Sequence, residues 1–381
     1  MFNFSRENTG LIAKWWRNVD KQILLCFVFL FLLGLFFSFS STSPIIGEKL
    51  NKETYFFFIK HFLFVLISLS LLIFISIQKR DKIIKFLMPL FIISIFFLFL
   101  VPFIGIEIKG SKRWIDLFFF PRFQPIELVK PLFILFTAKI LILDNKIKIY
   151  NRYILSFLWL FLIIGLLIFQ PDLGQSFLII SSWLAMIFVS GFNMLFLIFL
   201  GIISLIIVSV LIYLFPSKFG YIFFRIQTFL NPKTGDNFQS QKALDAIKQG
   251  GLTGQGMGEG ILKDKVPEAH TDYIIAVISE EFGAIFIFFI LIIFFLVCYR
   301  VLSKVFSEKD EFLKLSLIGL ISLIIIQAFI HIGVNIRLLP TTGMTFPFLS
   351  YGGSSLVGSA IVSGIILSLT RKDASRNLEN E

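Results

Sequence analysis

Long apolar runs alternate with short polar segments along almost the whole chain. A helix needs about 20 apolar residues to cross the hydrocarbon core of a bilayer, and ten runs reach or approach that length. The pattern therefore predicts an all-α integral membrane protein of about ten transmembrane helices. The predicted spans are residues 22–40, 55–77, 83–106, 125–143, 153–169, 174–191, 194–214, 275–299, 313–334 and 346–369.

Composition supports the same fold class. Of the 381 residues 57% are hydrophobic and only 15% are charged, whereas a soluble domain carries about 25% charged residues. A soluble core could not bury this much apolar surface. The 51 phenylalanines fit lipid-facing positions, where any large apolar side chain serves. We therefore expect one membrane domain over residues 1–381, with no separate soluble domain.

The distribution of Lys and Arg sets the orientation. If the N-terminus lies inside, the inside segments hold 18 basic residues and the short outside segments hold seven. Because basic residues accumulate in cytoplasmic loops, we expect segment 1–21 and the tail 371–381 to be cytoplasmic. The polar segment 215–274, between the seventh and eighth predicted helices, is then a large extracytoplasmic loop.

The net charge of +11 does not indicate nucleic acid, because the basic residues fall mostly between apolar runs. It indicates membrane topology and contact with anionic lipid, and an anionic substrate is the sharper alternative. Cys26 and Cys298 lie in different apolar runs, which suggests neither a disulfide nor a metal site.

Two outer segments carry charges suited to an anionic, amphipathic ligand. Lys112 and Arg113 could bind phosphate while Trp114 lies at the bilayer interface, although the same residues could form an interfacial anchor. Glu127 and Lys130 stand three apart and share a helix face. They could form a structural ion pair, or Lys130 could contact a lipid-linked phosphate.

The turn at 170–176 places Asp172 at a helix start, where it is expected to cap the helix. The long loop opens around Arg225 and continues into a glycine-rich stretch at 250–260. The stretch lacks the strand–turn–helix context and the lysine of a nucleotide-binding loop. Its glycines are expected to allow tight turns close to the membrane.

The end of the long loop holds the sharpest candidate site. Glu268, His270 and Asp272 alternate, so an extended backbone would place all three on one face, whereas a helix would make Glu268 and Asp272 neighbours. Partial desolvation would make a carboxylate here a stronger base near neutral pH. Three interpretations remain open: a solvated cluster, a divalent-metal site and a general base.

The last outer segment, 334–355, interrupts the membrane entry with two prolines, three glycines and several hydroxyls. Irregular backbone at membrane depth needs protein or a water-filled cavity around it, and we expect a cavity here. Ser354 has no paired base nearby in sequence, which argues against a covalent nucleophile. His331 is expected to be a helix-packing residue.

Together these segments resemble the SEDS family (shape, elongation, division and sporulation). The resemblance rests on GSKRWI, QPIELVK, QPDLGQS, RIQTFLNP, VPEAHTDYI with EEFG, and NIRLLPTTGMTFPFLSYGGSS, which occur in family order across nearly the whole chain. The run LLPTTGMTFPFLSYGGSS and the WWRNVD before the first span resemble the cell-division branch of the family more than its elongation branch.

The resemblance implies a peptidoglycan glycosyltransferase of the bacterial inner membrane that polymerises lipid II at the division septum. Its implied partners are a class B penicillin-binding protein and other division proteins, and it implies no nucleic acid. Asp272 matches the proposed catalytic residue and would act as general base. The implied substrate-binding residues are Lys112, Arg113, Trp114, Lys130, Arg225, Glu268, His270 and Ser354.

Several alternatives stay open beside this function. A divalent cation, Mg²⁺ or Mn²⁺, could assist the basic residues at the pyrophosphate, and no other cofactor is implied. A lipid II flippase, a non-catalytic division scaffold and an elongation-type polymerase remain rival interpretations.

Overall fold

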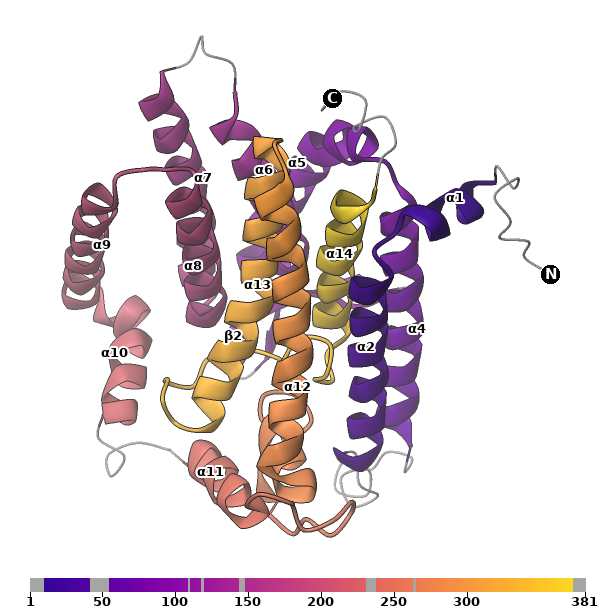
Figure 1. Cartoon of the computed structure of the whole chain (residues 1–381). Helices are drawn as coiled ribbons and strands as arrows, with labels where there is room; N and C mark the ends of the chain where they lie inside the picture. The colour runs from indigo at the N-terminus through magenta and orange to yellow at the C-terminus, as the bar shows by residue number, and fades with distance from the viewer. Residues whose placement is uncertain are drawn as a thin grey trace.

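The computed structural model describes residues 10–41, 55–108, 110–117, 120–143, 148–230, 238–262 and 265–372. Within these ranges the chain is nearly all helical and has one small sheet (Figure 1). The elements are α1 Leu11–Asn18, α2 Lys21–Ser41, α4 Phe56–Ile77, α5 Arg80–Ile104, β1 Ile106–Ile108, β2 Ser111–Leu117, β3 Phe120–Phe123, α6 Ile126–Leu141, α7 Ile149–Phe169, α8 Leu173–Val189, α9 Met194–Leu214, α10 Pro216–Leu230, α11 Phe238–Gly250, α12 Ile274–Ser307, α13 Glu311–Asn335 and α14 Gly353–Thr370.

Each of the ten predicted runs overlaps one helix of the structure. Among the described residues, seven of these helices are long and apolar enough to cross a membrane: α2, α4, α5, α7, α12, α13 and α14. The other three are the 16-residue α6, the 17-residue α8 and α9, whose apolar stretch is Leu197–Ile206. The protein is a multi-pass membrane protein, as predicted.

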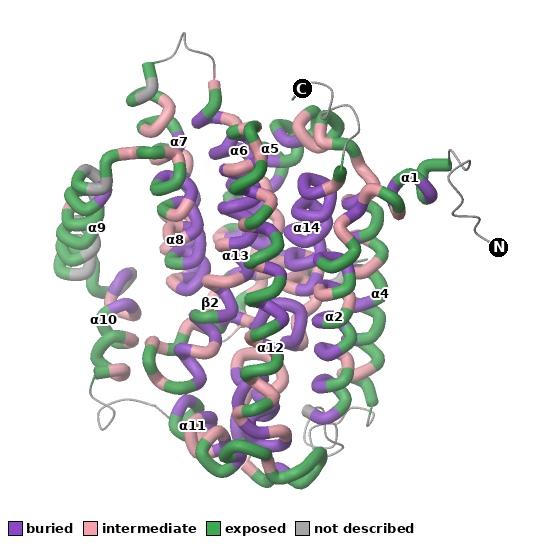
Figure 2. Tube along the Cα trace, in the orientation of Figure 1, coloured by how far each residue is buried: buried purple, intermediate pink, exposed green. Residues whose placement is uncertain are grey.

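The bundle has a buried centre and an exposed periphery (Figure 2). In α13 and α14, 72% of the most apolar window is buried, against 22% in α7 and 28% in α4 and α5. α13 packs against α6, α8 and α12, and α14 packs against α4. The outer helices leave large apolar side chains such as Phe161 and Phe288 exposed, which suits contact with lipid tails.

Some central helices are shorter than their neighbours. At 1.5 Å per residue, the 17-residue α8 and the 18-residue α14 are about 26 and 27 Å long, whereas the 25-residue α13 is about 38 Å. Figure 1 shows α8 and α14 stopping short of the end that α12 and α13 reach. The turn before α8 and the loop before α14 therefore lie within the bundle and not at its edge.

The outer segments hold more structure than the sequence predicted. β1, β2 and β3 form an antiparallel sheet between the third and fourth predicted spans. The segment 215–274 contains α10 and α11, while residues 231–237 and 263–264 lie outside the described residues. α12 is broken at Gly283, where φ is 76°.

The last predicted span began too early. Residues 346–352 are not helical, and α14 starts at Gly353. The Phe348 ring packs between the rings of Phe27 and Phe31 on α2, at centroid distances of 5.5 and 5.1 Å, and Phe346 is only 1% exposed. Protein therefore covers the irregular backbone at residues 344–350. The cavity predicted for segment 334–355 lies beside its earlier part, where Arg337, Leu339, Pro340 and Thr341 line a pocket of about 200 Å³.

The two ends of the described chain meet at one face of the bundle. The Lys372 N–H donates to the Asn18 carbonyl at 3.0 Å, and the Arg371 guanidinium donates to the Ile77 carbonyl at 3.0 Å. An even number of spans requires this arrangement, which agrees with the prediction that the termini share a side. Residues 1–9 of the predicted N-terminal segment and 373–381 of the predicted tail lie outside the described residues.

Candidate functional site

Asp272 lies in a turn that leads into α12. The N–H groups of Thr271 and Asp272 both donate to the Glu268 carbonyl, at 3.0 and 3.1 Å, as in the first turn of a helix. The extended arrangement with three side chains on one face is therefore wrong, but the segment is not a regular helix either: residues 267–273 form turns, and Glu268 has a φ of 60°. The His270 ring instead packs against Phe57, at a centroid distance of 5.7 Å.

Asn335 fixes the backbone that carries Asp272. Its Nδ2 donates to the Asp272 carbonyl at 3.2 Å, and its Oδ1 accepts the Ala276 N–H at 3.3 Å. The Ala276 N–H lies in the first turn of α12 and also donates to the Tyr273 carbonyl at 3.0 Å, so Asn335 Oδ1 is a second acceptor for it. Asn335 is fully buried at the last residue of α13. The end of α13 thereby sets the position of the start of α12.

The Asp272 carboxylate and the Arg113 guanidinium converge on Gly343. A methyl group at Gly343 would stand 3.6 Å from both Asp272 Oδ2 and Arg113 Nη1, so these two atoms lie within twice that distance of each other. Asp272 is half-buried, Arg113 is buried and Gly343 is exposed. Glycine at 343 has a φ of 67° and no side chain between these two charged groups. We call the region formed by Asp272, Arg113 and Gly343 the recess.

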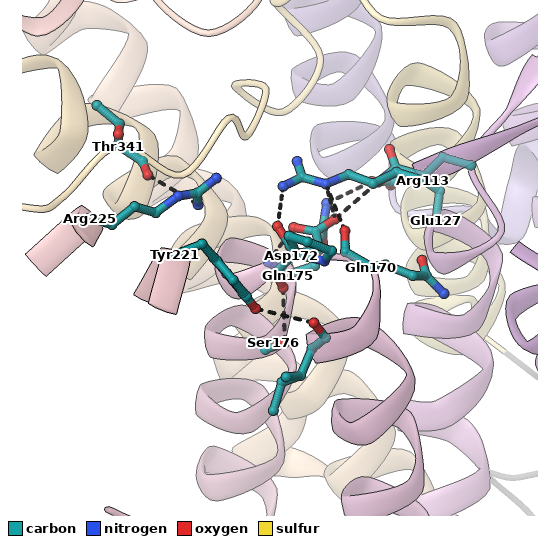
Figure 3. Close-up of polar contacts among 12 residues, drawn as sticks. Arg113, Glu127, Gln170, Asp172, Gln175, Ser176, Tyr221, Arg225 and Thr341 are labelled. Atoms are coloured by element: carbon teal, nitrogen blue, oxygen red, sulfur yellow. Dashed lines mark hydrogen bonds and ion pairs between the residues drawn. The ribbon is translucent and has the colours of Figure 1, made fainter. Parts of the chain in front are cut away.

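The turn before α8 holds Arg113 from behind (Figure 3). Arg113 Nε lies 3.7 Å from Asp172 Oδ2 and 3.4 Å from the Gln170 carbonyl oxygen, and Nη2 donates to the Pro171 carbonyl. The Asp172 carboxylate also accepts the Gln175 N–H at 3.4 Å and caps α8. The predicted cap is confirmed, and the same carboxylate balances the charge of Arg113 inside the bundle.

A second guanidinium approaches Arg113 from α10. Figure 3 shows Arg225 pointing toward Arg113, and Arg225 Nη1 donates to the Thr341 carbonyl at 3.5 Å. Burial and then the positive charge of Arg113 lower the pKa of Arg225, while Asp172 opposes the shift. An anion between two cations that repel each other would stabilise both.

A pocket of about 200 Å³ opens beside Arg225. Among the described residues that line it, Arg225 and Arg337 are charged and none is acidic. The remaining wall combines hydroxyl groups with the apolar side chains of Phe224, Phe229 and Leu339. This mixture of cations and apolar surface suits an amphipathic anion.

Behind the recess a chain of paired polar groups crosses the centre of the bundle. Glu127 Oε1 accepts from Gln175 at 3.1 Å, and Glu127 Oε2 lies 2.8 Å from Lys130 Nζ. Lys130 donates to Gln327 at 3.4 Å, and Gln327 donates to the Thr345 carbonyl at 3.0 Å. Glu127 and Lys130 are each 3% exposed. Of the two predicted roles for Lys130, the structure shows the ion pair. We call these five residues the polar chain.

The loop before α14 grips the segment that carries Asp272. Ser350 Oγ donates to the Thr271 carbonyl at 2.7 Å, and the Tyr351 N–H donates to the His270 carbonyl at 2.9 Å. The Tyr351 ring also packs against the His270 ring, at 5.6 Å between centroids. Burial raises the pKa of Tyr351 to about 12, so its hydroxyl stays neutral. His331 is 1% exposed and packs on Phe346, which confirms its predicted packing role.

Three predicted binding residues lie away from the recess. Successive side chains of a strand point to opposite faces, and β2 turns Arg113 inward and leaves Lys112 exposed opposite Glu107. Trp114, two residues on, is half-buried in the same strand. The Ser354 hydroxyl accepts the Gln124 N–H at 3.0 Å and donates to the Arg122 carbonyl at 3.1 Å, so it joins β3 to α14.

The glycine-rich stretch is part of the scaffold. Two buried carboxylates bind its backbone: Glu280 accepts the Leu262 N–H at 2.7 Å and Glu281 accepts the Gly258 N–H at 3.1 Å. Gly254 has a φ of 80°, and a Cβ there would stand 2.2 Å from the Glu281 carbonyl oxygen. The glycines therefore allow the tight turns and close approach that were predicted.

The three candidate metal ligands Glu268, His270 and Asp272 are not brought together among the described residues. No three His, Cys, Asp or Glu side chains among them are grouped as metal ligands. In particular, the His270 ring packs on Phe57 and Tyr351, while Asp272 faces Gly343. Glu268 and His270 therefore do not join Asp272 as a metal-binding set.

Charged groups of both signs thus meet near Gly343 in a multi-pass membrane protein. The sequence model of the FtsW, RodA and SpoVE family, described as cell cycle protein, matches residues 20–375. The chain belongs to this family, as the sequence motifs predicted.

Similar proteins extend over almost the same length. A Caulobacter vibrioides protein named probable peptidoglycan glycosyltransferase FtsW is 33% identical over 371 residues, which cover 97% of this chain and 93% of that protein. Stage V sporulation protein E of Bacillus subtilis is 34% identical over 365 residues, covering 93% and 98%. A solved chain of a peptidoglycan synthase complex has the same fold, with a TM-score of 0.75, 23% identity and coverage of 92% and 97%.

The sequence did not identify Asn335 or Gly343 as part of the candidate site. It identified Asp172 only as a helix cap and not as the partner of Arg113. Asn335 carried no signal, because an Asn at a helix end is ordinary. Gly343 was one glycine among several in an irregular segment. Asp172 was assigned only as a cap, and its contact with Arg113 joins positions 59 apart in sequence, which periodicity cannot reveal.

Proposed function

We propose that this protein is a peptidoglycan glycosyltransferase that polymerises lipid II into glycan strands, with Asp272 as general base. The convergence of Asp272 and Arg113 on Gly343, with Arg225 beside Arg113, carries this proposal. Lipid II presents a sugar hydroxyl to a base and a pyrophosphate to cations. The names of the relatives support the same reaction.

In the proposed reaction, Asp272 Oδ2 takes the proton of the acceptor's GlcNAc 4-hydroxyl. The hydroxyl oxygen attacks the anomeric carbon of the donor, the bond from that carbon to the pyrophosphate oxygen breaks, and undecaprenyl pyrophosphate leaves with the electron pair. General base catalysis contributes about a hundredfold to ten-thousandfold. Arg113 and Arg225 stabilise the charge that develops on the leaving group.

We place this reaction at the outer leaflet of the bacterial inner membrane, at the division septum. The Lys and Arg distribution supports cytoplasmic termini, and the division-protein name of the relatives supports the septum. We further propose a class B penicillin-binding protein as partner, together with other division proteins. Coordination of polymerization and crosslinking, described for the complex that contains the similarly folded chain, is in line with this partner.

Labelled lipid II supplied in detergent to the purified protein with its transpeptidase partner tests the proposal. Wild type should make glycan strands, and Asp272→Asn should slow strand synthesis by at least about a hundredfold. The control is Asp116→Asn, which removes a 48% exposed carboxylate on β2 and should retain the wild-type rate. Equal rates for Asp272→Asn and wild type would refute the role of Asp272 as base.

Assays of the same purified protein in detergent and in liposomes distinguish the rival functions. A flippase only moves lipid II between leaflets, so in detergent, where there are no leaflets, it would produce no glycan strands. Lipid II scrambling in liposomes without strand synthesis would identify a transporter. Partner binding with neither reaction would identify a scaffold.

A further inference from the structure

A basic pocket lies at the face where the two ends of the described chain meet. It has a volume of about 520 Å³ and is formed where α1 ends, α2 begins, and α12 and α14 end. Its basic lining residues are Arg17, Lys21, Arg300, Lys304 and Lys372. Asp20 is the one acidic residue among the described residues of the lining. The proposed glycosyltransferase reaction uses none of these groups.

The protein itself satisfies the Asp20 carboxylate. Asp20 Oδ2 lies 3.0 Å from Arg300 Nε, and Oδ1 accepts the N–H groups of Gln22 and Ile23 at 3.1 and 3.3 Å. Lys304 has its own neighbour in Glu308, at 3.7 Å. With Arg17, Lys21 and Lys372 also in the lining, the pocket as a whole is positive.

Helix dipoles do not explain all of these cations. Basic residues at the ends of α12 and α14 complement the negative ends of those helices, which accounts for Lys304 and Lys372. Lys21, however, is the first residue of α2, where the positive end of the dipole disfavours a cation. A bound anion would offset that unfavourable placement.

α1 places the pocket at the level of lipid headgroups. Leu11 and Ile12 are 76% and 47% exposed, while the Trp15 indole is buried and donates to Ser76 Oγ at 3.0 Å. Lys21 Nζ lies 5.2 Å from the centre of the Trp16 ring. A short amphipathic helix with tryptophans lies in the plane of the membrane interface. The pocket next to it is therefore within reach of phospholipid phosphates.

We propose that this pocket binds the phosphate of an anionic membrane phospholipid, whose acyl chains remain in the bilayer beside the bundle. The volume falls in the range of about 300–1,000 Å³ that holds small ligands. Basic pockets between transmembrane helices on the cytoplasmic side take anionic headgroups, and this face is the one predicted to be cytoplasmic.

Native mass spectrometry of the full-length protein in detergent tests the proposal. The probes are phosphatidylglycerol, phosphatidylcholine with the same acyl chains, and inorganic phosphate. We expect retention of phosphatidylglycerol and not of phosphatidylcholine. The variant Arg17→Gln/Lys21→Gln/Lys372→Gln should weaken phosphatidylglycerol binding by about a hundredfold, since each of the three cations near an anionic headgroup is worth about fivefold.

The matched control removes three exposed charges from the same end of the bundle. Lys82, Lys85 and Lys309 are exposed near the Arg80–Asp310 ion pair that joins α5 to α13, and none of them lines the pocket. The variant Lys82→Gln/Lys85→Gln/Lys309→Gln should bind phosphatidylglycerol as wild type does. If the pocket variant does not fold, Lys21→Gln alone should weaken binding by about fivefold.

Four results would overturn the proposal. Equal losses in the pocket and control variants would show a diffuse effect of surface charge. Equal retention of phosphatidylcholine would show that the anionic headgroup is not recognised. Displacement of phosphatidylglycerol by inorganic phosphate at the same concentration would assign the pocket to a free phosphate. Displacement by an acidic peptide at a lower concentration would assign it to a protein partner. None of these outcomes depends on strand synthesis, so the glycosyltransferase proposal is judged separately.

Discussion

Replacing Lys130 by methionine removes the cation at the centre of the polar chain and leaves the buried Glu127 carboxylate without its ion-pair partner. The two charged atoms lie 2.8 Å apart and both residues are 3% exposed. At an effective dielectric constant of about 20 their attraction is about 6 kcal/mol, much of which offsets the desolvation of the two groups. Breaking a buried pair by removing one partner costs about 3–5 kcal/mol, and we expect this loss for Lys130→Met.

The double variant Glu127→Gln/Lys130→Met should recover most of that loss. It leaves no buried charge, and a glutamine at 127 keeps an oxygen that can accept from Gln175. The remaining cost is the hydrogen bond from Lys130 to Gln327, about 1 kcal/mol. A double-mutant cycle should therefore give a coupling energy of at least about 2 kcal/mol.

SDS-induced unfolding in mixed micelles measures the four proteins of this cycle. Additive losses, with no recovery in the double variant, would refute the reasoning, because an ion pair that stabilises the fold must be coupled. Strand synthesis by the same proteins then tests the second predicted role of Lys130. A stable double variant with wild-type activity would leave the lysine purely structural, whereas a stable but inactive one would place it at the pyrophosphate.

Two further predictions concern the scaffold of the recess. Asn335→Ala removes the hydrogen bond to the Asp272 carbonyl, while the Ala276 N–H keeps the Tyr273 carbonyl as an acceptor. We therefore expect a loss of about 1–3 kcal/mol and a rate of strand synthesis reduced by up to about a hundredfold through misplacement of Asp272. An unchanged rate would contradict this positioning role. Gly254→Ala should prevent folding, because its Cβ would collide with the Glu281 carbonyl. The matched Gly165→Ala, in α7 with nothing within 4 Å, should fold and gain up to about 1 kcal/mol. Size-exclusion chromatography and thermal unfolding compare the two glycine variants.

The helices were predictable because lipid imposes a simple rule on sequence. Every backbone polar group in hydrocarbon must be bonded internally, so each span is an uninterrupted apolar run that hydropathy detects. The rule does not hold for segments that are surrounded by protein and not by lipid. Phe346 and Phe348 were predicted to begin a span, but they pack an irregular loop into the core of the bundle.

The site was predictable in part. Asp272, Arg113 and Arg225 were singled out from charge and position, and the structure brings them to one recess. Strand alternation separated Arg113 from Lys112, which could not be foreseen while β2 was taken for a loop. The contacts that position the charged groups, such as Asn335 with Asp272, join helices far apart in sequence and follow from packing alone.

The polar chain has a consequence for how sequences of this family can change. A substitution of Glu127, Lys130, Gln175 or Gln327 leaves a neighbouring group without its partner in an apolar interior, at about 1–3 kcal/mol for a neutral group and more for a charged one; Thr345 takes part only through its backbone carbonyl. Viable descendants must keep the whole set or exchange several members at once, so these positions should covary. The lipid-facing positions have no such constraint, because any large apolar side chain serves there. The 51 phenylalanines of this chain are in line with free exchange among apolar residues at these positions.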